Sequence, residues 1–155
     1  MMRAETIVRN NEEMRRFAGE FLSSLDQSAE RATVICLNGE LGSGKTTFVK
    51  ACAKILGVAE NVISPTFLIL KTFATKHKKY KLLHHIDAYR LISEKELEAL
   101  GWREMLDDSR NLIFVEWASE VRKIMPEESI ELNFKFIDEE TRSIEEISPS
   151  SSSGW

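Results

Sequence analysis

Gly39, Gly44, Lys45 and Thr46 stand at a spacing that is typical of one kind of chemistry. Four residues separate the two glycines, and the lysine and threonine directly follow the second, within NGELGSGKTT, residues 38–47. Glycines allow the backbone to wrap closely around an anion, so that its N–H groups can donate to it. Lysine adds an ammonium group, and the threonine hydroxyl can ligate Mg²⁺. The pattern matches the phosphate-binding loop and predicts a nucleotide-binding protein.

Such a loop requires a buried strand before it and a helix after it. TVICL, residues 33–37, is a β-prone apolar run without alternation, as expected of a strand covered on both faces of a parallel sheet. After Thr46, apolar residues recur at helical spacing until Gly57. Because both flanks are present, we disfavour the alternative that the glycines merely turn a strand into a helix.

The residues of the predicted loop have separate expected roles. Its backbone should enclose the phosphates of ATP, and the Lys45 ammonium should reach the β- and γ-phosphates. The Thr46 hydroxyl is expected on Mg²⁺, and Thr47 at the α-phosphate. The predicted nucleotide contacts here are Glu40, Leu41, Gly42, Ser43, Gly44, Lys45, Thr46 and Thr47.

Two carboxylates compete for the second position on the metal. Glu116 ends NLIFVE, an uninterrupted apolar strand, whereas Asp87 ends LLHHID, whose histidines are less typical of a central parallel strand. We expect Glu116 on the metal, directly or through water, and Asp87 near the γ-phosphate, where it would orient water or metal. With Lys45, they are the predicted catalytic residues. An ordinary strand-end carboxylate is the alternative for either.

Two further segments are candidates for contacts, each with a simpler reading. Trp117 follows Glu116 and would wall the nucleotide pocket, with plain packing as its alternative. KHKKYK, residues 76–81, is a basic tip between two predicted antiparallel strands, SPTFLILKTF and YKLLHHIDAY. A charged hairpin tip is usually a solvated edge, so we favour that reading over contact with tRNA or an acidic partner.

The composition is that of one ordinary domain. The chain has 155 residues, of which 43% are hydrophobic, and a net charge of −4 that argues against a wholly basic nucleic-acid surface. We predict one domain over residues 1–147 and a flexible serine-rich tail over residues 148–155. Neither a membrane-spanning apolar stretch nor a secretion signal is evident, so no membrane contact and a cytoplasmic location are expected.

Adenine is the expected base, because the chain contains no guanine-reading Asn-Lys-x-Asp stretch. A free-standing small-molecule kinase remains the alternative to an ATPase. Such a kinase would normally carry an arginine-bearing lid over the transferred phosphate. Arg90 and Arg103 are the only arginines between the loop and Asp107, and neither lies in an obvious lid insertion. For Arg90 we favour structural ion pairs and leave a phosphate-facing role open.

Taken in order, GELGSGKTT, SPTF, HIDAYRL and VEWASE resemble the TsaE family of bacterial ATPases of tRNA threonylcarbamoyladenosine synthesis. The resemblance spans about residues 6–137. It implies an α/β fold of the three-layer P-loop NTPase type, with a mixed, mostly parallel central sheet flanked by helices. It also implies Thr46 and Glu116 as magnesium ligands, Asp87 as a residue needed for turnover, and Thr66 as a switch-like residue near the γ-phosphate.

The same resemblance implies how the protein works in the cell. It predicts weak ATPase activity alone and a complex with TsaB and TsaD subunits, in which TsaD carries out the threonylcarbamoyl transfer. ATP turnover would then support repeated modification at adenosine 37 of tRNA, which the protein would contact indirectly through the complex. Many relatives place a threonine near the adenine, where this chain carries Met14.

Overall fold

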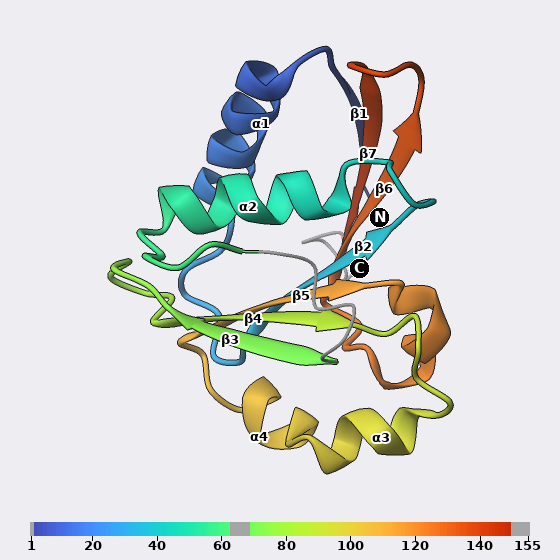
Figure 1. Ribbon diagram of the computed structural model, residues 1–155. Helices are drawn as coiled ribbons and strands as arrows, with labels where there is room; N and C mark the ends of the chain where they lie inside the picture. Colours follow the sequence, from blue (N-terminus) through green and yellow to red (C-terminus); the bar gives the residue numbers. More distant parts are fainter. Residues whose placement is uncertain (1, 63–68, 150–155) are drawn as a thin grey trace.

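Seven strands form one sheet in the order β1-β7-β6-β2-β5-β4-β3 (Figure 1). The structure is a computed structural model that describes residues 2–62 and 69–149. The strands are β1 (Met2–Val8), β2 (Thr33–Asn38), β3 (Leu70–Ala74), β4 (Leu82–Asp87), β5 (Asn111–Glu116), β6 (Ile130–Phe136) and β7 (Arg142–Ser148). The helices are α1 (Asn11–Ser23), α2 (Lys45–Ile55), α3 (Glu94–Ala99), α4 (Trp102–Leu106) and the 3₁₀ helix η1 (Ala118–Ile124).

The centre of the sheet is parallel and its margins are antiparallel. Strands β6, β2, β5 and β4 run in one direction, so their carboxyl ends meet at one edge. Strand β7 joins β6 and β1 joins β7 in antiparallel fashion, and β3 pairs with β4 in the same way. This arrangement confirms the predicted mixed sheet.

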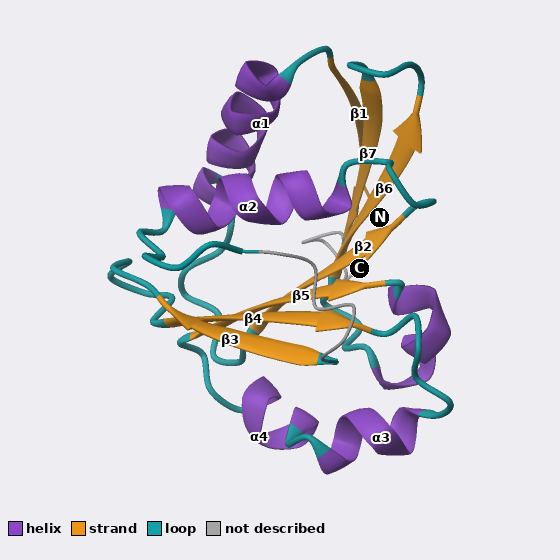
Figure 2. Cartoon of the chain, viewed as in Figure 1, coloured by secondary structure: helices purple, strands orange, loops and turns teal. Residues whose placement is uncertain are grey.

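Helices cover both faces of the sheet (Figure 2). Helices α1 and α2 lie over one face, and α3, α4 and η1 lie over the other, so the sheet is the middle of three layers. A separate cluster of buried apolar side chains fills each interface. The three-layer α/β fold predicted from the sequence is therefore confirmed. Among the described residues, no helix is both long and apolar enough to span a bilayer.

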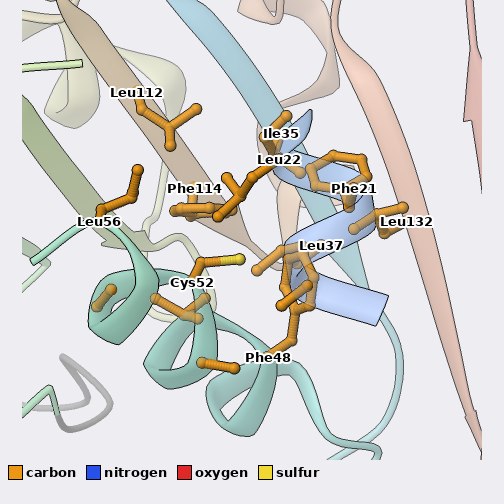
Figure 3. Close-up of a cluster of buried hydrophobic side chains, with 14 of the residues drawn as sticks. Phe21, Leu22, Ile35, Leu37, Phe48, Cys52, Leu56, Leu112, Phe114 and Leu132 are labelled. Carbon is orange, nitrogen blue, oxygen red and sulfur yellow. The ribbon is translucent and has the colours of Figure 1, made fainter. Parts of the chain in front are cut away.

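Phe48 of α2 is the centre of the larger core. Its ring is fully buried, and the centroids of the Phe17, Phe21, Phe114 and Phe134 rings lie 5.6–5.9 Å away. Figure 3 shows α1, α2 and the strands converging on this cluster. Since α2 begins directly after the glycine loop, this packing also fixes where the loop ends.

The structure agrees with the sequence on the place of β4 and adds one short helix, α4. The histidines of LLHHID are less typical of a central parallel strand, and β4 indeed lies nearer the edge of the sheet than β5, between β5, to which it is parallel, and the edge strand β3, to which it is antiparallel. Helix α4 was not predicted, because five residues are too few for a clear helical repeat. The SPTF segment, with Thr66, and the tail from residue 150 lie outside the described residues.

Candidate nucleotide and metal site

The glycine loop connects β2 to α2, as the sequence predicts. Gly39 has φ 145°, and a Cβ there would lie 2.5 Å from the Phe134 carbonyl oxygen, so only glycine fits. Gly44 caps α2 with φ 104°, in the left-handed region that side chains disfavour. The loop therefore approaches β6 closely. The first N–H groups of the 11-residue helix α2 point toward the loop.

Lys45 lies at the start of α2 and is 5% exposed. Its ammonium donates to the Gly39 carbonyl and stands 4.1 Å from the centroid of the Trp117 ring. Burial lowers the pKa of Lys45, while the charges of Glu116 and Asp87 act in the opposite direction. The ammonium is thus placed inside the loop, beside both predicted carboxylates.

Asp87 and Glu116 lie side by side at the carboxyl edge of the sheet. They are register partners in the parallel pair β4–β5, and their side chains are buried. The Asp87 carboxylate accepts the Tyr89 N–H at 2.9 Å. Burial raises the pKa of Asp87, and this effect exceeds the opposing one of the Tyr89 hydrogen bond. The β4–β5 register thus brings together two carboxylates that are 29 residues apart in the chain.

Glu116 has the direct connection to the loop. The Thr46 hydroxyl donates to Glu116 Oε2 at 3.3 Å, and the His85 ring contacts the same oxygen through Nε2. A hydroxyl that donates its proton keeps its lone pairs, so Thr46 and Glu116 present oxygens of the kind that Mg²⁺ prefers. The donor set therefore fits the predicted metal and favours Glu116 over Asp87 as the carboxylate on it.

Trp117 has an unusual backbone conformation. Its φ is 59°, the only positive value at a described residue other than glycine. Its N–H donates to the Leu37 carbonyl at 3.0 Å, and its ring lies 4.9 Å from that of Tyr89. This conformation holds the indole against the Lys45 ammonium, as expected of a residue that walls the pocket. Strain of this kind is common at binding sites.

These groups border a cleft of about 590 Å³. It is lined by the predicted loop residues Glu40, Leu41, Gly42, Ser43, Gly44, Lys45, Thr46 and Thr47, and by Asp87, Tyr89, Arg90, Glu116, Trp117 and Arg142. The structure therefore brings together all of the predicted site residues that it describes. Arg90 is among the lining residues, so its phosphate-facing role stays open.

A second hollow of about 260 Å³ adjoins the loop on its other side. Gly44, Thr47 and Arg142 border both cavities, and Met14 of α1 lines the smaller one. Arg142 of β7 donates from Nε to the Gly42 carbonyl at 3.1 Å. No role for Arg142 can be recognised from the sequence, because the contact joins residues 100 positions apart.

The sequence analysis also assigned no role to His85. The available signal was the alternation of side chains along LLHHID, which places His85 and Asp87 on the same face of β4. His84 faces the opposite side, where its Nδ1 lies 2.9 Å from the Thr72 hydroxyl. Among the described residues, no group of three or more His, Cys, Asp or Glu side chains could hold a metal.

The basic tip lies away from this site. It joins the end of β3 to the start of β4, at the opposite edge of the sheet from Asp87 (Figure 1). The Lys76 N–H donates to the Leu56 carbonyl at the end of α2, and the Lys79 ammonium to the Ala29 carbonyl. The tip is therefore packed against the rest of the molecule and contributes nothing to the cleft.

Comparison with known proteins gives one consistent family. The model of the family "Threonylcarbamoyl adenosine biosynthesis protein TsaE" matches residues 8–144. The tRNA threonylcarbamoyladenosine biosynthesis protein TsaE of Rickettsia bellii is 36% identical, over 92% of this chain and 93% of its own. The TsaE protein of Haemophilus influenzae is 33% identical, over 86% of this chain and 82% of its own.

A solved structure agrees with the sequence relatives. The crystal structure of Bacillus subtilis YdiB superposes with a TM-score of 0.73 at 25% sequence identity, covering 97% of this chain and 88% of that one. The chain belongs to the TsaE family.

Proposed function

We propose that this protein is a magnesium-dependent ATPase subunit that acts with TsaB and TsaD in the threonylcarbamoyladenosine modification of tRNA. The observation that carries the ATPase part is the convergence of Lys45, Thr46, Asp87 and Glu116 around one glycine loop. The pathway is supported by family membership and by the names of the relatives. The partners and an indirect contact with tRNA follow from the family resemblance.

Each part of the cleft has a proposed role in binding. The loop amides and the Lys45 ammonium bind the phosphates, and the ammonium leaves the Gly39 carbonyl to do so. The base occupies the smaller hollow beside Met14, because Gly44 and Thr47 border both cavities and so connect them. Met14 Cε would lie 3.4 Å from a Cβ at Gly44, so its thioether stands close to the start of α2.

The hydrolytic step is proposed for the carboxyl edge of the sheet. Thr46 and Glu116 would hold Mg²⁺, which when bound supplies positive charge to the β- and γ-phosphate oxygens. Asp87 accepts a proton from the attacking water and so orients it toward the γ-phosphate. The raised pKa of Asp87 favours this role, because a carboxylate that binds protons more readily is the better acceptor. Trp117 and Tyr89 wall this end of the cleft.

The proposal is tested by following γ-labelled ATP with purified protein, alone and with TsaB and TsaD. We expect slow release of free phosphate from the protein alone and a changed rate when both subunits are present. Asp87→Ala should lose turnover while keeping its affinity for nucleotide. If the protein were a binding switch without catalysis, this variant would keep both its affinity and its response to the partners. Transfer of the label to a small molecule would instead identify the rival small-molecule kinase. An unaltered rate without co-elution of the subunits would refute the partnership.

A further inference from the structure

His85 is a buried polar residue for which the proposed reaction has no direct use. Its side chain is 0% exposed, and it lies on β4 two residues before Asp87. The ring contacts Glu116 Oε2 through Nε2. Among the described residues, Nδ1 has no hydrogen-bond partner. The ring therefore has a single polar contact here, and that contact is to the carboxylate expected on the metal.

The direction of this hydrogen bond follows from the chemistry of the pair. An ionised carboxylate only accepts hydrogen bonds, so the proton of the bond must lie on His85 Nε2. Thr46, in the first turn of α2, donates to the same carboxylate oxygen. Two donors on Oε2 fix the plane and rotamer of Glu116 and leave Oε1 without either bond.

Glu116 needs such support because its own backbone does not determine where its carboxylate lies. A glutamate side chain has several rotatable bonds, and ordering it costs conformational entropy. Groups that hydrogen-bond a metal ligand from behind commonly change metal affinity by about 10- to 100-fold, because they hold the ligand in its binding geometry. The His85 contact is of this kind, because His85 lies on β4 and holds the Glu116 side chain of the neighbouring strand β5.

We propose that His85 is a positioning residue that holds Glu116 in the orientation required for the divalent cation. This inference rests on the proposed function and adds to it a residue that does not touch nucleotide or metal. His85 affects the metal only through Glu116, so its loss should weaken metal binding more than nucleotide binding. A residue needed only for packing would show no such split.

The test measures metal binding rather than turnover. Mn²⁺ is titrated into protein saturated with a non-hydrolysable ATP analogue, and free Mn²⁺ is followed by electron paramagnetic resonance. His85→Leu, which cannot donate, should weaken Mn²⁺ binding by about tenfold or more. Affinity for the analogue measured in EDTA should stay close to that of wild type. A folded His85→Leu protein with wild-type Mn²⁺ affinity overturns the inference.

Two amide variants keep the test decisive if His85→Leu does not fold. In His85→Gln the amide nitrogen of the side chain stands near the position of His85 Nε2. In His85→Asn the side chain is too short for its amide nitrogen to reach Glu116. We expect Gln to keep most of the Mn²⁺ affinity and Asn to lose it. Equal Mn²⁺ affinity in the two variants contradicts the inference.

His84 provides the matched control, because it is the neighbouring buried histidine on the other face of β4 and contacts Thr72 instead of Glu116. His84→Gln should leave Mn²⁺ affinity unchanged in the folded protein. Measurements on the wild type distinguish failure of the proposed function from failure of the role of His85. If it binds no nucleotide with Mn²⁺, the proposed function fails. If it binds both, and the His85 variants bind them equally well, only the role of His85 fails.

Discussion

The first turn of α2 and the turns that follow it lie in different surroundings. Lys45 and Thr46 face a cleft in which charges of both signs are buried with few partners. Two residues later, Phe48 is enclosed by four other phenylalanine rings, of which Figure 3 labels those of Phe21 and Phe114. The core is complete in itself, whereas the cleft holds an ammonium with a lowered pKa and a carboxyl with a raised one.

The core is thus the region that stabilises the fold, and the cleft is the region for which we propose nucleotide binding. Apolar burial around Phe48 contributes free energy of folding without any ligand. Burial of Lys45 and Asp87 disfavours their charged forms, and we propose that the nucleotide and metal account for their presence there. Variants in the core should therefore lose stability, and variants in the cleft should lose binding while the fold persists.

Phe48→Ala should give the largest effect and falls on the core side of the comparison. Removal of a fully buried ring leaves a cavity among its aromatic neighbours, and we expect a loss of about 3–5 kcal/mol in the free energy of unfolding. Denaturant titration measures it. Phe136→Ala is the control, because Phe136 is half exposed and should cost less than about 1 kcal/mol. Equal losses in the two variants would contradict the assignment of Phe48 as the centre of the core.

Lys45→Ala should show the opposite pattern. Loss of a charge-assisted contact worth about 1.5–3 kcal/mol lowers affinity for the magnesium complex of an ATP analogue by about 10- to 150-fold. The free energy of unfolding should not fall, because burial of the ammonium opposes its charge. Lys50→Ala, an exposed lysine on the same helix, should bind like wild type. Near-normal affinity in Lys45→Ala would contradict the assigned role.

Asp87→Asn should have a smaller effect, which depends on pH. The raised pKa means that the folded protein binds this proton more tightly than the unfolded chain. Ionisation of Asp87 therefore costs stability above the raised pKa, and the cost disappears as the pH falls toward the ordinary value of 3.8.

Thermal unfolding measured across this range checks the sign. Asp87→Asn should melt at a higher temperature than wild type at pH 7, and the difference should shrink on acidification. A lower melting temperature for Asp87→Asn at pH 7 would show that Asp87 belongs with the stabilising contacts of the core.

The sequence predicted those parts of the site that depend on local spacing. The glycine loop, the strand ends at Asp87 and Glu116, and the flanking helix can each be recognised from a few adjacent residues. The contacts of His85 with Glu116 and of Arg142 with Gly42 were not predicted, because they depend on strand order and register. The parallel pairing of β4 with β5, which places Asp87 beside Glu116, likewise depends on strand order.

Calorimetric titration of the folded protein with Mg²⁺ and a non-hydrolysable ATP analogue measures whether the glycine loop and its carboxylates bind nucleotide. We expect saturable heat at one site per chain, which is reduced by omission of Mg²⁺ and abolished or strongly weakened in Lys45→Ala. The absence of any heat with protein that unfolds cooperatively would contradict the account, because the loop and its carboxylates would then bind no nucleotide.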